Sequence, residues 1–341
     1  MQASPIAILG RGLVSAVGLT YTATCTAIRA KACNPTPTHF IDADGEWILA
    51  NQVCLDRPWY GLAKLKRMVA MALDEALSDA PGDVRAATPL LLCLAESERP
   101  GRMDGLDDSL LRALQDALQI GICRESCTVP QGRVGTAVAL EKARRLIHDD
   151  GHPYVVIASA DSLLHWPTLS DFQRRDRLLS DSNSNGIVAG EGAGALLLGK
   201  PPPIPSLLCL GVGMATEKAS ITSEEPLKGT GLVSAIRAAL EDADCRVDDL
   251  EARMTDLAGE HFFFKEAALA IAKTMRVRKS HLDIMHPAEC TGETGAVIGS
   301  TMMALAEFEY AKGYASGPRL LHFANDAGER AALIVGWSSN R

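Results

Sequence analysis

The chain has 341 residues, of which 47% are hydrophobic and 22% charged, a composition typical of a protein with a substantial core, and the length allows one large domain or two of medium size. Its net charge of −8, without any basic block, argues against nucleic acid or an anionic membrane as the main partner, and no run of about 18 apolar residues predicts a membrane span. The nine cysteines are scattered without the paired spacing of a zinc site, and the N-terminus has no basic segment before an apolar run, so we expect reduced thiols, no metal or other cofactor, and a cytoplasmic location.

Apolar periodicity predicts alternating strands and helices in the first 200 residues. We expect strands over 6–9, 89–94, 126–129 and 154–159, and helices over 20–30, 60–78, 107–118 and 135–148. A polar stretch that begins at Leu179 then leads into a run of small residues, Gly190–Gly194, followed by an apolar strand over 195–198. Glycines at this spacing indicate close approach of another backbone.

The segment Lys200-Pro-Pro-Pro-Ile-Pro205 can continue neither a helix nor a central strand, and the pattern restarts after it. Leu207–Gly213 repeats the Leu-Gly-x-Gly ending of Ile6–Gly12. Helices are expected over 232–244, 263–275 and 294–312, and strands over 254–258, 282–286, 319–323 and 331–337. The sequence therefore predicts two similar α/β halves, 1–200 and 206–341, within one compact unit.

Gly10-Arg11-Gly12 after a strand is also compatible with part of a dinucleotide-binding fingerprint. Ser15 stands at the position of the third glycine, and no acidic residue ends a second strand at the required distance. We therefore do not expect a dinucleotide site.

Several segments together resemble the β-ketoacyl-[acyl-carrier-protein] synthases of the thiolase superfamily. The matching segments are the polar loop before Gly-Glu-Gly-Ala-Gly, the opening strand Ile6–Gly18, the long helix Lys64–Ala80, the helix segment Ala143–Ile147 and Gly295-Ala-Val297. The resemblance implies a thiolase-like duplicated fold with five layers, αβαβα, which almost always dimerises through the sheet edge beside the nucleophile. The segment 126–129 would be that edge strand.

Synthases of this family carry a nucleophilic cysteine at a strand-to-helix elbow, where the helix N-terminus stabilises the thiolate. Counting back from Leu146-Ile147 without gaps puts Arg133 at that position, and a two-residue insertion would put Gln131 there. Neither side chain forms a thioester. Cys127, earlier in the expected strand, is the possible displaced nucleophile, although a structural thiol is the more ordinary interpretation.

The family's two histidines have no counterpart in the aligned segments. His261 lies near the first position but out of register, and Glu289 falls at the position of the second, with Ile284 where a lysine is expected. The family's gate near the C-terminus corresponds to Phe323–Arg330, which keeps only Gly328. Decarboxylative condensation needs a thiolate and two neutral imidazoles, so the resemblance implies a member that has lost this chemistry.

The resemblance would still bring Glu260, His261, His286, Glu289, Asn325 and Asp326 near the old pocket, beside Gln131 and Arg133. We expect a vestigial pocket in which these groups satisfy one another. New acid–base chemistry by a Glu/His pair is an alternative, and a metal site from His286 and Glu289 is a weaker one.

Two further segments have ordinary interpretations. Phe262-Phe263-Phe264 predicts core or dimer packing rather than an acyl tunnel. Gln173–Arg177 predicts a solvated helical face, although a basic patch there would suit an acyl carrier protein.

By resemblance, the leading hypothesis is a condensation-inactive partner, scaffold or adaptor subunit, as subunits without the cysteine are in some polyketide and quinolone pathways. It would be a homodimer or a heterodimer with a related synthase subunit. The alternative is an acyltransferase or hydrolase of the superfamily with rebuilt catalytic residues.

Overall fold

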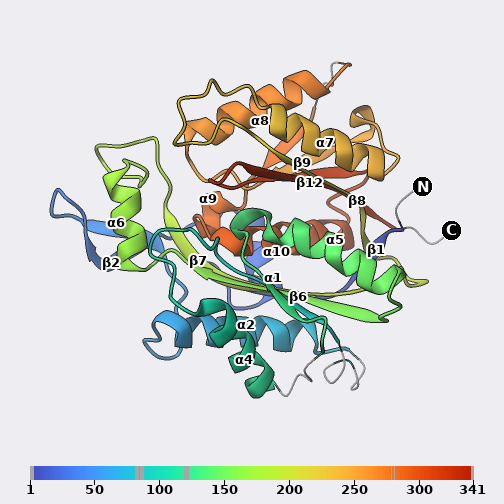
Figure 1. Cartoon of the computed structure of the whole chain (residues 1–341), viewed down its shortest axis with the longest axis horizontal. Helices are drawn as coiled ribbons and strands as arrows, with labels where there is room; N and C mark the ends of the chain where they lie inside the picture. The colour runs from blue at the N-terminus through green and yellow to red at the C-terminus, as the bar shows by residue number, and fades with distance from the viewer. Residues whose placement is uncertain are drawn as a thin grey trace.

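The computed structural model describes residues 4–80, 84, 88–118, 123–277, 279 and 281–338. Two layers of sheet alternate with three layers of helix (Figure 1). Helices α2 (Gly61–Ala76) and α4 (Leu106–Leu118) cover one outer face, and α7 (Thr230–Asp242) and α8 (His261–Thr274) cover the other. This is the predicted five-layer arrangement.

The first sheet has the strand order β1-β7-β6-β4-β5. Its strands are β1 (Ile6–Ser15), β7 (Ala189–Gly199), β6 (Tyr154–Ser162), β4 (Leu90–Cys93) and β5 (Cys127–Val129). The pairs β1·β7 and β6·β7 are antiparallel, whereas β4·β6 and β4·β5 are parallel. β5, in the segment predicted at 126–129, forms one end of this order.

The second sheet repeats this topology, with the order β8-β12-β11-β9-β10. Its strands are β8 (Leu207–Thr216), β12 (Glu329–Trp337), β11 (Arg319–Ala324), β9 (Ala252–Thr255) and β10 (Asp283–Met285). The directions also repeat, with β8·β12 and β11·β12 antiparallel and β9·β11 and β9·β10 parallel. A short antiparallel contact between β1 and β8 joins the two sheets.

The middle layer contains α5 (Gly135–His148) and α10 (Ile298–Ala311), which pack between the two sheets. Every residue of α10 from Ile298 to Tyr310 is buried. A helix with apolar residues on all sides belongs in such a position. The remaining helical segments are α1 (Tyr21–Arg29), α6 (Trp166–Arg174), α9 (Ala288–Thr291) and the 3₁₀ turns η1 (Gly132–Val134), η2 (Val247–Asp249) and η3 (Gly295–Val297).

The repeated Leu-Gly-x-Gly segments mark the same contact in both halves. A Cβ at Gly10 or Gly12 would lie 2.1 or 2.0 Å from the carbonyl oxygen of Ala76 or Ala72 in α2. A Cβ at Gly211 or Gly213 would lie 2.2 or 2.1 Å from a carbonyl oxygen of α7. These glycines let each outer helix lie directly on its sheet. Because Gly10 and Gly12 lie inside the strand β1, they form no loop between a strand and a helix of the kind that binds the phosphates of a dinucleotide.

The small-residue run differs from its prediction as a segment that precedes a strand. Gly190–Gly194 lies inside β7, which is buried along its whole length. A Cβ at Gly194 would lie 2.5 Å from the side chain of Ser300 in α10. The run therefore serves close packing of the middle layer within the strand itself.

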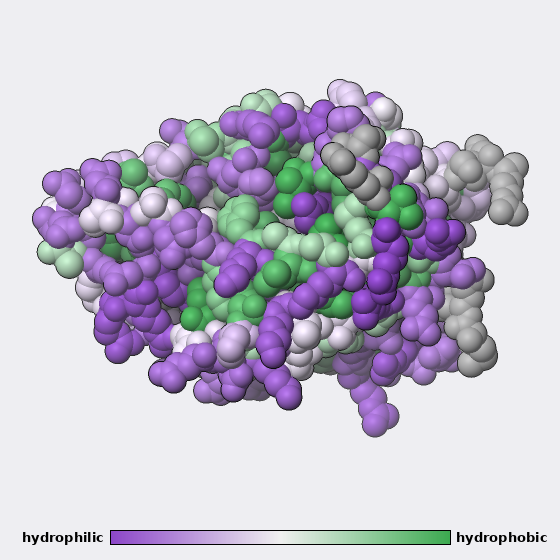
Figure 2. Space-filling view, turned by 90° about the horizontal axis from the view of Figure 1, so that it is seen from above, coloured by the Kyte–Doolittle hydropathy of each residue, from purple (hydrophilic) through white to green (hydrophobic). Residues whose placement is uncertain are grey.

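Two strands that the sequence did not predict, β2 (Thr36–Ile41) and β3 (Trp47–Asn51), form an antiparallel hairpin, and β3 also pairs with β7. The hairpin and α6 project from one end of the molecule (Figure 1). Among the described residues, no helix combines the length and the apolar character that crossing a membrane requires. Viewed from the α7 and α8 side, hydrophobic residues gather in the centre, and the end with the hairpin is mostly hydrophilic (Figure 2).

Candidate functional site

Arg133 lies at the elbow between β5 and α5, inside the turn η1. Gly132 allows this turn because its φ of +53° is in the left-handed region, and a Cβ there would overlap the carboxyl of Glu96. The N–H of Gly132 donates to the carbonyl of Leu94, at a distance of 2.9 Å. The turn presents the Arg133 side chain to a pocket between the two halves.

Carboxylates from three separate elements surround the Arg133 guanidinium. Its Nη2 lies 2.9 Å from Oδ1 of Asp326, in the turn between β11 and β12, and its Nη1 lies 3.3 Å from Oε2 of Glu293, just before η3. Its Nε lies 3.9 Å from Asp256, at the end of β9. The ring of Phe263 covers the guanidinium at 4.4 Å, so Arg133 is held on several sides.

A second arginine extends this network. Arg177 follows α6, and its Nε and Nη2 donate to the two oxygens of Glu260 at 2.6 and 2.9 Å. Its Nη1 donates to Asp326 at 2.6 Å, so Asp326 bridges both arginines. Such bidentate pairs fix both partners geometrically.

The pKa values follow the crowding of charges. Burial raises the pKa of Glu293 to about 7, although Arg133 and the N–H of Gly295 oppose this effect. Burial acts on Asp326 in the same direction, but Arg133 and Arg177 outweigh it and hold the pKa below its usual value. Burial also raises the pKa of Asp256. The environment of the site therefore favours the protonated form of Glu293 and Asp256 and the ionised form of Asp326, each relative to a free carboxyl.

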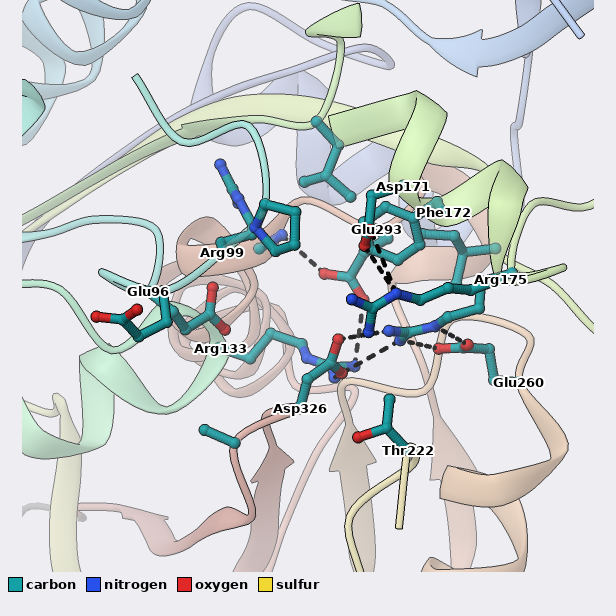
Figure 3. A pocket seen from close by; sticks show the side chains of 17 residues that line it. Glu96, Arg99, Arg133, Asp171, Phe172, Arg175, Thr222, Glu260, Glu293 and Asp326 are labelled. Carbon is teal, nitrogen blue, oxygen red and sulfur yellow. Dashed lines mark hydrogen bonds and ion pairs between the residues drawn. The ribbon is translucent and has the colours of Figure 1, made fainter. Parts of the chain in front are cut away.

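A pocket with a volume of about 240 Å³ is lined by Arg133, Arg177, Glu260, Glu293 and Asp326 (Figure 3). Six of the described lining residues are carboxylates and four are arginines, and none is a cysteine or a histidine. Arg99 lines it from the loop after β4 and is held by both oxygens of Asp161, at 2.7 Å each. The carboxyls of this pocket can accept and release protons. Each of its four arginines already forms an ion pair with a carboxylate.

Of the two candidates at the elbow, Arg133 lines the pocket and Gln131 does not. Gln131 Nε2 donates to Glu329 at 3.2 Å, and Asn325 Nδ2 donates to the same carboxylate at 2.6 Å. Gln131 and Asn325 therefore meet beside the pocket, at the start of β12.

The histidines and Glu289 lie elsewhere, contrary to the expectation that they converge with Arg133. His261 is exposed at the start of α8. His286 Nε2 lies 3.6 Å from Glu289, and Glu289 lies 3.6 Å from Lys31. The short helix α9 turns Glu289 toward α1, and Glu293, four residues later, faces Arg133 instead. In the part of the chain that the structure describes, His286 and Glu289 belong to no cluster of three or more metal-ligating side chains.

Cys127 lies in the edge strand β5, outside the pocket lining. Its Sγ is 2.9 Å from Nζ of Lys142, about two turns into α5. The thiol is therefore separate from the elbow.

Sequence reasoning did not place seven of the ten charged lining residues in the pocket, among them Arg177, Glu293 and Arg99. Arg177 was assigned to a solvated helical face, but it is 9% exposed because the chain turns inward after α6. Glu293 and Arg99 were not singled out. The signal for Glu293 was a lone charge between two glycines in an otherwise uncharged segment, Thr291–Gly299.

Glu293→Gln is expected to change how stability depends on pH. A carboxyl whose folded-state pKa is raised stabilises the fold below its unfolded pKa and loses that contribution as the pH rises through the folded pKa. The wild-type free energy of unfolding should therefore fall relative to that of Glu293→Gln between about pH 4.5 and 7, by roughly 1–3 kcal/mol. Urea unfolding at pH 5 and pH 8 measures the difference. The exposed Glu224→Gln is the control, and a difference for Glu293→Gln that does not change with pH would contradict the expectation.

Comparison with known proteins bears on the fold. No protein-family model matches the chain, and no curated protein was found as a relative. Among solved structures, the ketosynthase ApeO with its chain length factor ApeC from Xenorhabdus doucetiae matches with a TM-score of 0.80 and 16% identity, covering 98% of each chain. The ishigamide ketosynthase/chain length factor matches with a TM-score of 0.69 and 19% identity, covering 98% of this chain and 100% of that chain. A chain of AntDE:AntF, a type II polyketide synthase acyl-carrier protein in complex with its ketosynthase, matches with a TM-score of 0.81 and 14% identity, covering 99% of this chain and 100% of that chain. The chain therefore has the mixed α/β, thiolase-like fold of the ketosynthases.

Proposed function

We propose that this protein is a ketosynthase-like subunit that does not condense acyl groups and acts as a partner of an active synthase subunit. The observation that carries the proposal is Arg133 at the elbow, enclosed by Glu293, Asp326 and Asp256. Covalent acyl transfer needs a nucleophile at such an elbow. A guanidinium remains protonated in proteins and has no lone pair to attack a thioester.

The solved structures with this fold support the choice of partner. Those containing ApeO with ApeC, and the ishigamide proteins, pair a ketosynthase with a chain length factor. A subunit of this fold whose pocket is lined by ion-paired arginines and carboxylates suits the role that the chain length factor has beside its ketosynthase. The proposal includes an acyl carrier protein as an indirect partner, bound by the active synthase subunit, because AntDE:AntF is such a carrier in complex with its ketosynthase.

Incubation with acyl-CoA or acyl-carrier donors is expected to leave the protein unmodified. No pocket-lining residue that the structure describes carries a thiol, and Cys127 lies on an edge strand away from the helix N-terminus at the elbow. Intact-mass spectrometry measures the outcome, with an active ketosynthase as the positive control. An added acyl mass that disappears in Cys127→Ala would overturn the proposal and identify a displaced nucleophile.

Assembly is expected to occur through β5. This strand ends the sheet order, and an open strand edge favours pairing with another strand. We expect a dimer at micromolar concentration by light scattering, either of this chain alone or with a co-expressed ketosynthase subunit, in which two β5 strands pair antiparallel about a two-fold axis. A monomer under both conditions would contradict this expectation.

One observation favours the alternative of a rebuilt acyltransferase or hydrolase. The pKa of Glu293 lies near 7, where a carboxyl works well as an acid or a base. Turnover of acyl-CoA or nitrophenyl esters that is lost in Glu293→Gln would support this enzyme, and absence of turnover would exclude it for these substrates.

A further inference from the structure

The outer face of the β2–β3 hairpin is apolar and exposed. Trp47 and Leu49 alternate along β3 and are 54% and 50% exposed, while the residues between and after them are buried. Their cross-strand partners are Ile41 and Pro37, also exposed. Leu179, in the loop after α6, is 49% exposed beside them. Clustered large apolar side chains of this kind mark an interaction site more often than scattered ones do.

This face is hollowed rather than flat. The hairpin and the loop 178–183 enclose a hollow with a volume of about 490 Å³, which we call the hairpin groove. It is separate from the Arg133 pocket, with which it shares no lining residue. A groove of this volume accommodates large side chains of a bound partner.

The rim of the hairpin groove carries charge of one sign. Five of its lining residues are carboxylates and none is a lysine, arginine or histidine. The five are Asp42, Asp44, Glu46, Asp176 and Asp181. Within the described residues, none of these carboxylates takes part in an ion pair. The mostly hydrophilic end of the molecule in Figure 2 is the end at which this groove lies.

The charge selects among occupants. An anionic membrane or a nucleic acid would meet five unpaired carboxylates of its own sign. A second copy of the chain has a net charge of −8, and an isologous contact would set one acidic rim against the other. A cationic partner gains from the same charges, because opposite potentials across an interface speed association and exclude wrong partners.

We propose that the hairpin groove binds a polypeptide segment in which lysine or arginine side chains flank a large apolar residue. The apolar residue lies against Trp47 and Leu49, where exclusion of water supplies most of the affinity. The basic side chains meet the acidic rim and set orientation and specificity. This proposal is independent of the role of Arg133.

The test selects a random peptide display library for binding to the full chain. The selected peptides are then compared for binding to the wild type and to two variants. Trp47→Ser/Leu49→Ser removes the apolar floor. Asp44→Asn/Glu46→Gln/Asp181→Asn removes charge from the rim, whereas Asp42 is kept because its carboxylate accepts the turn's N–H groups and Asp176 because its φ is +52°. Ile204→Ser is the matched control, because Ile204 is an exposed apolar residue in the proline segment.

Selection is expected to enrich peptides with lysine or arginine around leucine, phenylalanine or tryptophan. A synthetic copy of the most enriched peptide should bind the wild type and Ile204→Ser equally, and bind each groove variant about tenfold more weakly. Its affinity should fall as sodium chloride rises. Circular dichroism confirms that the variants are folded.

Four results would overturn the proposal. The first is selection that yields no peptide dependent on Trp47 and Leu49. The second is enrichment of acidic or uncharged peptides. The third is a wild-type dimer that Trp47→Ser/Leu49→Ser abolishes, which would assign the groove to a second copy of the chain. The fourth is binding of RNA or of phosphatidylserine vesicles that becomes stronger in Asp44→Asn/Glu46→Gln/Asp181→Asn and is lost in Trp47→Ser/Leu49→Ser. This result would show that the groove binds another class of partner instead of a peptide.

Discussion

Replacing Arg330 with methionine is expected to lower the free energy of unfolding by about 3–5 kcal/mol. The Arg330 side chain is fully buried, and its Nε lies 2.8 Å from Oε1 of Glu266, whose side chain is 1% exposed. Its Nη1 also donates to the carbonyls of Asn325 and Glu329 at 2.9 Å. Methionine fills similar space but leaves Glu266 without a cation in the interior.

Chemical denaturation at pH 7 measures this loss of stability. Two control variants show whether it comes from the buried, unpaired charge of Glu266. Arg145→Met removes a solvent-exposed ion pair with Glu141 and should cost at most about 0.5 kcal/mol. Arg330→Met/Glu266→Leu should recover much of the loss, because no unpaired charge remains. Burial raises the pKa of Glu266, so the cost of Arg330→Met should shrink at acidic pH. Equal costs for Arg330→Met and Arg145→Met would show that the buried pair does not stabilise the fold.

A single methyl group at Gly12 is expected to cost about 3 kcal/mol. In Gly12→Ala the new Cβ would lie 2.0 Å from the carbonyl oxygen of Ala72. Neither atom can rotate away, because the backbone of β1 sets the position of the Cβ and the oxygen belongs to the backbone of α2. Helix α2 must then move off β1. Thermal and urea unfolding measure the change.

Matched substitutions separate this close contact from the general effect of replacing glycine. Gly135→Ala places its Cβ 3.4 Å from Cys93, an ordinary contact, at the start of α5, where alanine favours helix. It should be neutral or slightly stabilising. Gly213→Ala should reproduce the cost of Gly12→Ala, since its Cβ would lie 2.1 Å from the carbonyl oxygen of Ala235 in α7. A neutral Gly12→Ala would contradict the duplicated helix-on-strand contact.

Regular periodicity made most of the fold predictable from the sequence. The helix expected over 135–148 has those bounds, and the strands over 319–323 and 331–337 begin within two residues of β11 and β12. The hairpin β2–β3 was missed because the exposed positions of β3, Trp47 and Leu49, are apolar like the buried ones, so the strand lacks the alternation of apolar and polar residues that identifies a half-buried strand.

The site was less predictable, because its members meet only in three dimensions. Arg133 was identified from its spacing to the helix that follows. Counting along the chain put Glu289 opposite it, whereas the turn α9 moves Glu289 outward and brings Glu293 in. Arg177 has the local pattern of a surface residue, and its burial is explained by its pairing with Glu260 and Asp326, which lie far away in the sequence. Ion pairs between residues far apart in sequence leave no periodic signal.

The pairing of β1 also determines when this chain can begin to fold on the ribosome. Residues 6–15 emerge long before their partners, β7, which ends at Gly199, and β8, which begins at Leu207. At about 5–20 residues per second, the first strand stays unpaired for roughly 10–40 s of synthesis. During that interval the apolar segment Ile6–Leu9 is available to chaperones and to other nascent chains, and the native sheet closes only once β7 and β8 have been made.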